Sequence, residues 1–279
     1  MNILSFDIEE WFHPEIFNGM FPQSSWDKLE PRVEKNTEII LNFLNRKRLK
    51  ATFFFVGWVA EKYPQLVQAV AQEGHEIGSH SYAHSMITKM TPESFREDLK
   101  RSLDVLNSLS NHSVIGFRAP TFSITKETLW AIPILFEEGI RYDSSVFPIY
   151  HDRYGIPDAP REPYQIYKNG DDGVWEYPMT TVQFGNFNLP VGGGGYFRLY
   201  PFSLTQYLMK KCIREGRNLI FYAHPWEFDL GLPRVKMGVL KSLRHYTGIK
   251  KFLDRLDRLT DLFPFTSFRE VLSSRVQQN

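Results

Sequence analysis

The 279-residue sequence has a single cysteine, Cys212, so an intramolecular disulfide framework is excluded. It also lacks any run of about 18 apolar residues, and we therefore expect no membrane span. The N-terminus, MNILSFDIEEWF, has neither the basic segment nor the long apolar segment of a signal peptide. These absences predict a cytoplasmic protein. Its length of 279 residues is enough to bury a full hydrophobic core.

An excess of charge of one sign is also missing. The 33 basic residues are nearly balanced by 32 acidic residues, which leaves a formal net charge of +1. This balance gives no electrostatic argument for binding to nucleic acid or to an anionic membrane surface. The basic residues that gather toward the C-terminus are interpreted as part of a solvated helical region over residues 230–279. The sequence indicates no oligomeric state.

The chain does contain alternating strand and helix patterns. Short apolar, β-branched or aromatic runs predict strands over residues 2–6, 51–57, 75–81, 114–120, 140–145 and 218–224. Amphipathic segments between them predict helices over residues 32–49, 60–74, 91–109 and 125–139. Repeated strand–helix units indicate one α/β domain over residues 1–279, with a parallel sheet that is either open or closed into a barrel.

The alternation stops between Pro148 and Pro201. This stretch is rich in proline, glycine and charge, and it contains four consecutive glycines that begin at Gly192. No glycine pattern of a dinucleotide- or phosphate-binding loop follows a strand here. We expect residues 149–200 to form an insertion over the mouth of the barrel, where Gly194 would let the backbone approach a ligand.

Polar side chains follow the predicted strands at their C-terminal ends. These candidate site residues are Asp7, Glu9, His80, His84, Arg118, Asp143 and His224. In α/β barrels, this rim is where catalytic sites are assembled. Seven polar groups at corresponding positions therefore indicate an active site.

Part of this set has the composition of a metal site. His80 and His84, in GHEIGSHSYAH, are four residues apart and can reach one ion. Two histidines with a carboxylate and an open position form a zinc-type catalytic centre. Residues two apart in a strand point the same way, so Asp7 and Glu9 project together. One acid can bind the ion while the other remains free as a base, and Glu10 is the alternative ligand.

Several motifs resemble, in the same order, those of the NodB-type polysaccharide deacetylases, carbohydrate esterase family four. SFDIEE stands where that family has TFDDG, GHEIGSHSYAH resembles its H-[ST]-x-x-H metal motif, and GFRAPTF resembles its R-x-P motif. YDSS and LIFYAHPWEFD resemble its last two motifs. The segments HDRYGIPDAP, GGGGYFRLYP and RHYTG further resemble a subgroup associated with exopolysaccharide and capsule biosynthesis loci.

This resemblance implies a distorted parallel (β/α) barrel of about seven strands. It also implies hydrolysis of an N-acetyl group on an amino sugar of a polysaccharide or glycan precursor. One divalent ion would be bound by Glu9, His80 and His84, with zinc expected and cobalt, manganese or nickel as substitutes. The alternatives are a hydrolase of a non-sugar amide or cyclic ureide, and an inactive glycan-binding member of the family.

The family's roles, transferred motif by motif, make Asp7 the base and His224 the acid that protonates the departing amine. Arg118 would pair with Asp7, and Asp143 would orient His224. A backbone N–H near residues 121–122 would stabilise the oxyanion. The residues expected to contact the substrate are Phe122, Tyr222, Trp226 and Gly194.

Overall fold

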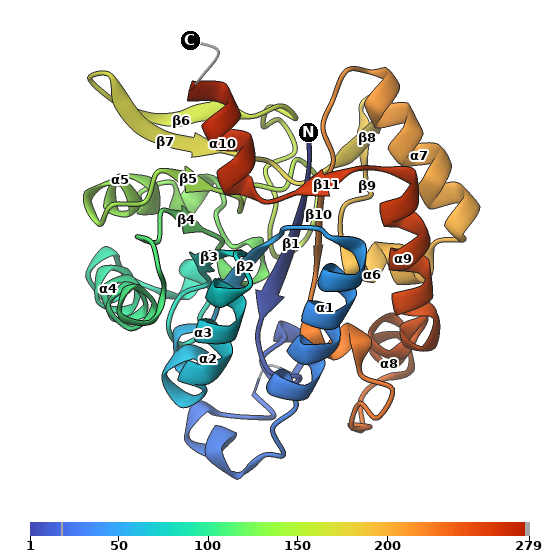
Figure 1. Ribbon diagram of the computed structural model, residues 1–279. Coiled ribbons are helices and arrows are strands. Elements are labelled where there is room, and N and C mark those ends of the chain that lie inside the picture. The colour runs from blue at the N-terminus through green and yellow to red at the C-terminus, as the bar shows by residue number, and fades with distance from the viewer. Residues whose placement is uncertain (18, 277–279) are drawn as a thin grey trace.

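The computed structural model describes residues 1–17 and 19–276, and its centre is a mostly parallel β-sheet surrounded by helices (Figure 1). The nine-stranded sheet of the described chain follows the order β10-β1-β2-β3-β4-β5-β7-β6, and β11 pairs with β1 outside that path. Its strands are β1 (Asn2–Ile8), β2 (Thr52–Phe55), β3 (Glu76–Ser79), β4 (Gly116–Phe117), β5 (Tyr142–Asp143), β6 (Tyr164–Asn169), β7 (Asp172–Glu176), β10 (Ile220–Ala223) and β11 (Phe265–Thr266). Every pair from β10 to β7 is parallel, and the β6–β7 pair is antiparallel. The α/β class predicted from the sequence is confirmed.

Helices cover the outside of this sheet, and a separate hairpin pairs β8 (Thr181–Phe184) with β9 (Phe187–Pro190). The α-helices are α1 (Val33–Lys47), α2 (Gly57–Lys62), α3 (Pro64–Gln72), α4 (Pro92–Leu109), α5 (Ala131–Glu137), α6 (Gly194–Leu199), α7 (Phe202–Arg214), α8 (Val239–Tyr246), α9 (Phe252–Leu262) and α10 (Phe268–Val276). Short 3₁₀ helices lie in the loops: η1 (Glu15–Phe17), η2 (Gln23–Lys28), η3 (Ile87–Lys89), η4 (Pro120–Phe122), η5 (Lys126–Thr128), η6 (Pro225–Phe228) and η7 (Ile249–Lys251). Within the described ranges, none of the helices has the length and apolar character needed to cross a bilayer.

The first strand shows how the sequence positions the site. Successive side chains of β1 point to opposite faces. Leu4 and Phe6 pack in the large apolar cluster beneath the helices, whereas Ser5 and Asp7 point into the barrel and contact the Arg118 side chain. All residues of β1 are buried, as is usual for parallel strands with both faces covered. The polar side chains near its C-terminal end therefore begin an enclosed site.

The two ends of the barrel differ. At the N-terminal ends of the strands, α10 closes the barrel, because Phe268 and Val271 pack with Ile3, Phe54 and Tyr142. Figure 1 shows α10 beside the N-terminus of the chain, at the end of the sheet from which β1 starts. The opposite end, toward which β1 runs, is the one that contains the predicted site residues.

The segment 149–200 does more than cover the mouth of the barrel, and this corrects the expectation of a simple insertion. Within it, β7 pairs in parallel with β5 and is part of the barrel wall. The chain after β7 closes the wall, since the Gly192 N–H donates to the Thr180 carbonyl and the Tyr222 N–H of β10 donates to the Gly192 carbonyl. The predicted distorted barrel of about seven parallel strands is confirmed, and β7, in the stretch expected to lie over the mouth, is one of its strands.

Candidate active site

A cavity of about 210 Å³ opens at the C-terminal ends of the strands. The five predicted polar residues that line it are Asp7, Glu9, His80, His84 and His224. Arg118 and Asp143 lie behind its wall and are fully buried. Phe122, Tyr222 and Trp226 form an aromatic wall of the same cavity.

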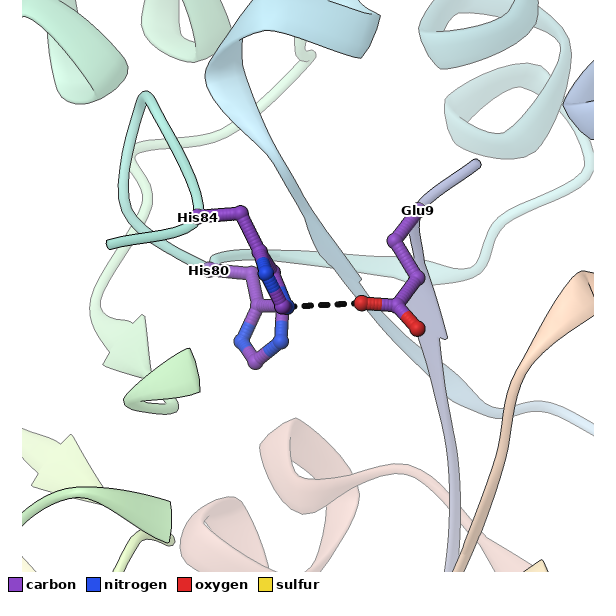
Figure 2. Close-up of side chains that lie close together, drawn as sticks. All are labelled: Glu9, His80 and His84. Atoms are coloured by element: carbon purple, nitrogen blue, oxygen red, sulfur yellow. Dashed lines mark ion pairs between the residues drawn. The ribbon is translucent and has the colours of Figure 1, made fainter. Parts of the chain in front are cut away.

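Glu9, His80 and His84 form a group that could hold a metal ion (Figure 2). One ligand atom of each residue lies within 4.8 Å of the other two, and Glu9 Oε2 lies 2.6 Å from His84 Nε2. Figure 2 shows the Glu9 side chain pointing from the end of β1 toward both imidazole rings. Two imidazole nitrogens and a carboxylate oxygen suit zinc and related divalent ions. The residues present therefore fit the ion that the sequence predicts.

A sharp turn after β3 brings the two histidines together. Ser81 and His84 have positive φ angles of 61° and 52°, which residues other than glycine rarely adopt. His80 Nδ1 lies 2.7 Å from the carbonyl oxygen of Arg118. A hydrogen bond from Nδ1 to this carbonyl leaves Nε2 available as a ligand and fixes the orientation of the ring.

The alternative ligand, Glu10, points away from this group. Its carboxylate accepts hydrogen bonds of 2.9 Å from the Arg32 N–H and 3.2 Å from the Val33 N–H, where α1 begins. Neighbouring residues of an extended chain face opposite sides, so Glu9 and Glu10 cannot both reach the histidines. Glu9 is therefore the carboxylate of the group.

The surroundings of His80 and Glu9 favour the protonation states in which these two residues bind a metal. Burial lowers the pKa of His80 to about 4, so its imidazole is neutral. Burial alone would raise the pKa of Glu9, but the charges of His84 and His224 outweigh it and hold that pKa below its usual range. Metal ligation requires a neutral imidazole and an ionised carboxylate.

Asp7 lies on the cavity floor and pairs with Arg118. Arg118 Nη1 donates hydrogen bonds of 2.7 Å to Asp7 Oδ1 and 2.9 Å to Ser5 Oγ. Its other N–H groups donate to the carbonyl and hydroxyl oxygens of Ser144. The buried guanidinium thus fixes one oxygen of Asp7, while Oδ2 faces His224 Nε2 at 3.9 Å.

The acidic partner of His224 is Glu227. His224 Nδ1 lies 3.1 Å from Glu227 Oε2, and Glu227 Oε1 accepts a hydrogen bond of 2.7 Å from Arg198 Nε. His224 Nε2 faces the cavity, 3.9 Å from both Asp7 Oδ2 and Glu9 Oε1. Burial opposes protonation, but the charges of Glu9, Glu227 and Asp7 raise the pKa of His224 to about 9. The imidazole is therefore protonated at neutral pH.

The prediction that Asp143 orients His224 is wrong. Asp143 accepts a hydrogen bond from the Ser145 hydroxyl and lies opposite Glu176 of β7. Burial raises the pKa of both carboxyl groups, and the charge of Asp143 adds to this effect on Glu176. The proximity of the two acids therefore favours the protonated form of Glu176. The error has a physical cause, because β7 was not recognised as the neighbour of β5.

Of the predicted substrate contacts, the three aromatic residues line the cavity. Phe122 and Tyr222 pack against each other with ring centroids 4.8 Å apart. Trp226 stacks on the His224 ring at 5.0 Å, and its Nε1–H donates a 2.9 Å hydrogen bond to Glu9 Oε1. Trp226 thus orients both the Glu9 carboxylate and the His224 imidazole.

Gly194 has another role than the one predicted, because it does not line the cavity. A Cβ atom at Gly194 would lie 2.0 Å from Glu227 Oε2. Glycine at this position therefore makes space for the carboxylate that contacts His224. The neighbouring Gly195 has no such restriction, since a Cβ atom there would have nothing within 4 Å.

The turn at residues 121–122 is a candidate oxyanion site. Thr121 and Phe122 have positive φ angles of 56° and 52°. The Phe122 N–H already donates to the Ala119 carbonyl at 3.0 Å, whereas Thr121 lines the cavity. Backbone with positive φ at residues other than glycine is concentrated at functional sites. The Thr121 N–H is therefore the candidate hydrogen-bond donor of this turn.

Sequence reasoning missed Glu227 and Arg198. A local signal for Glu227 was present, because His-Pro-Trp-Glu has the spacing of a capping box, with His224 before a short helix and the acid three residues later. No local signal existed for Arg198, which is 29 residues from Glu227 in the sequence and meets it through the packing of α6 on the barrel.

Two family models match separate parts of the chain. Residues 24–133 match the model described as polysaccharide deacetylase, and residues 144–273 match a domain of unknown function, DUF3473. A peptidoglycan-N-acetylglucosamine deacetylase of Bacillus cereus is 36% identical over 96 residues, which are 34% of this chain and 35% of that protein. The chain spans between 31% and 40% of the length of the first three curated relatives that it matches.

Solved structures share the fold. A structure from Mycobacterium smegmatis that was assigned to the polysaccharide deacetylases is 17% identical, with a TM-score of 0.62 over 99% of this chain and 90% of that chain. A carbohydrate esterase family four pseudoenzyme of Bacillus anthracis is 13% identical, with a TM-score of 0.52 over 98% of this chain and 65% of that chain. Residues 24–133 of the chain are thus similar to the polysaccharide deacetylases, and the fold is that of the solved structures.

The matched region contains only part of the site. His80, His84 and Arg118 lie within residues 24–133, whereas Glu9 and His224 lie outside them. His80 and His84 thus lie in the part that matches the polysaccharide deacetylase model, whereas His224 lies in the part that matches DUF3473.

Proposed function

We propose that this protein hydrolyses the N-acetyl amide of an amino sugar in a polysaccharide or glycan precursor. A divalent ion, expected to be zinc, would be bound by Glu9, His80 and His84. The observation that supports this most directly is a carboxylate and an imidazole that face one another beside this group, with His224 Nε2 3.9 Å from Asp7 Oδ2. Amide hydrolysis needs both a base and an acid at one place.

Asp7 acts as the general base in this proposal. Its Oδ1 is held by Arg118, so Oδ2 is the oxygen that accepts the proton of the attacking water. The buried guanidinium compensates the charge of Asp7 and prevents the carboxylate from rotating away. A fixed base near the attacked carbon lowers the entropic cost of reaching the transition state.

His224 acts as the general acid. Amine nitrogen is a poor leaving group unless it is protonated, and the Nε2–H of His224 faces the cavity. Glu227 holds Nδ1 and supports the protonated state. After C–N cleavage, the proton taken up by Asp7 can return to His224 across the same short gap.

The remaining parts of the site would stabilise charge and hold the sugar. A bound divalent ion would polarise the amide carbonyl and lower the pKa of water. The Thr121 N–H would donate to the oxygen that becomes negative in the tetrahedral state. Tyr222 and Trp226 would pack on the apolar faces of the sugar ring. The substrate is expected to belong to exopolysaccharide or capsule synthesis, on the strength of the sequence segments that resemble that subgroup.

The test is acetate release from a panel of N-acetylated oligosaccharides by zinc-loaded protein. Asp7→Asn and His224→Ala should each retain zinc and lose about 10²- to 10⁴-fold in kcat. Acetate release from simple amides or ureides alone would favour the non-sugar hydrolase. Tight binding of oligosaccharides with no acetate from any of them would leave glycan binding without turnover, and near-wild-type kcat in both variants would refute the mechanism.

A further inference from the structure

The segment 230–253 is strongly basic, although the net charge of the whole chain is +1. It has six cationic residues and no acidic residue. The six are Arg234, Lys236, Lys241, Arg244, Lys250 and Lys251, and all are exposed. Within residues 1–17 and 19–276, none of these six side chains forms an ion pair. We call residues 230–253 the basic segment.

The basic segment also exposes large apolar side chains. Val239, Leu240 and Leu243 of α8 are 75%, 83% and 57% exposed, and Leu230 is 76% exposed. Val239, Leu240 and Leu243 share one face of α8, because residues three and four apart are neighbours on a helix surface. The opposite face of α8 is anchored, because the His245 ring stacks on Trp226 at 4.6 Å. A helix that is anchored on one face and exposes valine and leucine side chains on the other indicates an interaction surface.

We propose that α8 and the basic segment dock on an anionic membrane surface. Helices that lie in the membrane interface insert apolar side chains below the headgroups and place lysine and arginine among them. Four outward apolar side chains among six cations that form no ion pair within the described residues have this composition.

Docking through α8 would also orient the catalytic cavity, because the helix lies beside it. Arg244 of α8 lines the catalytic cavity. Figure 1 shows α8 at the lower right of the molecule, in the half toward which β1 runs. A protein docked through α8 would therefore hold the cavity mouth beside the membrane, where a glycan attached to or extruded from the bilayer could enter it.

Two other partners fit the surface less well. A second copy that bound through the same face would bring the two sets of cations against each other, since such a contact is symmetric. Nucleic acid would neutralise the cations, but its phosphates offer nothing for Val239, Leu240 and Leu243. An anionic bilayer satisfies both kinds of side chain.

The test is sedimentation of the full chain with vesicles of phosphatidylcholine, either alone or mixed with phosphatidylglycerol. Binding is expected only with the anionic vesicles and should weaken as salt is added, because exposed charges are screened. The Val239→Ser/Leu240→Ser double variant should lower the partition coefficient by about tenfold or more. Lys241→Gln should lower it about fivefold.

The matched control is Phe184→Ser/Phe187→Ser, which removes two aromatic side chains that are 47% and 56% exposed on the β8–β9 hairpin. It should bind vesicles like the wild type. All variants should unfold at the wild-type temperature, since the altered side chains are exposed. Failure to bind anionic vesicles, equal loss in the control, or a dimer in light scattering that Val239→Ser/Leu240→Ser dissociates would each overturn the proposal.

Discussion

Replacing Glu227 with glutamine should lower the pKa of His224 and move the alkaline limit of activity to lower pH. The carboxylate lies 3.1 Å from His224 Nδ1 and is one of three acids that raise the pKa of this imidazole to about 9. A raised pKa means that the protonated, acid-competent form persists until the pH passes that value. Glutamine keeps the shape of the side chain and removes only its charge.

The size of the effect follows from the distance. An opposite charge within about 4–6 Å shifts a pKa by roughly 1–3 units. Glu9 and Asp7 remain in the variant, each 3.9 Å from Nε2, so we expect a fall of about 1–2 units. Glutamine also leaves the buried Arg198 without its charge partner, which should reduce the free energy of unfolding by about 3 kcal/mol.

Two assays measure this shift. One is the pH dependence of kcat on an active N-acetylated substrate, and the other is the NMR titration of the His224 ring in zinc-free protein, which does not require activity. The control is Asp143→Asn, which removes a buried carboxylate that does not contact His224. It should leave the titration of His224 near its wild-type value. An unchanged His224 titration in Glu227→Gln, or a larger shift in Asp143→Asn, would refute this account of the acid.

Three further predictions follow from the same geometry. Gly194→Ala should displace Glu227 and lower both thermal stability and the alkaline limit of activity, whereas Gly195→Ala, with an open position, should unfold at or above the wild-type temperature. His80→Ala should abolish zinc binding in metal analysis, whereas removal of the exposed His112 should leave one equivalent bound. The pKa of Glu176 is raised by burial, so the folded state keeps a proton that the unfolded chain loses near pH 4.5, and this contribution to stability falls as the pH rises from there. In chemical denaturation between pH 5 and 8, the free energy of unfolding should therefore fall less steeply with pH in Glu176→Gln than in the wild type. An equal slope would contradict a protonated Glu176 in the folded state.

The tertiary structure decided those contacts that join distant elements. Asp143 and Glu176 become neighbours only because β7 pairs with β5, and nothing local in this proline- and glycine-rich stretch indicates which strand β7 will join. The link from Arg198 to Glu227 likewise depends on how α6 packs against η6. Glu227 itself is only three residues from His224 in the sequence, so its link to Arg198 is the part that required the tertiary structure.

The fold class and much of the candidate site could be predicted from the amino-acid sequence alone. Alternation of apolar strands and amphipathic helices is a local property, and parallel strands bring their C-terminal ends to one edge whatever their order in the sheet. For this reason the polar residues at the strand ends could be grouped from the sequence alone: Asp7, Glu9, His80, His84 and His224. The orientation of α8 could not, because its amphipathic pattern fits an inward or an outward apolar face equally well. Only packing, with His245 against Trp226, turned Leu240 to the surface.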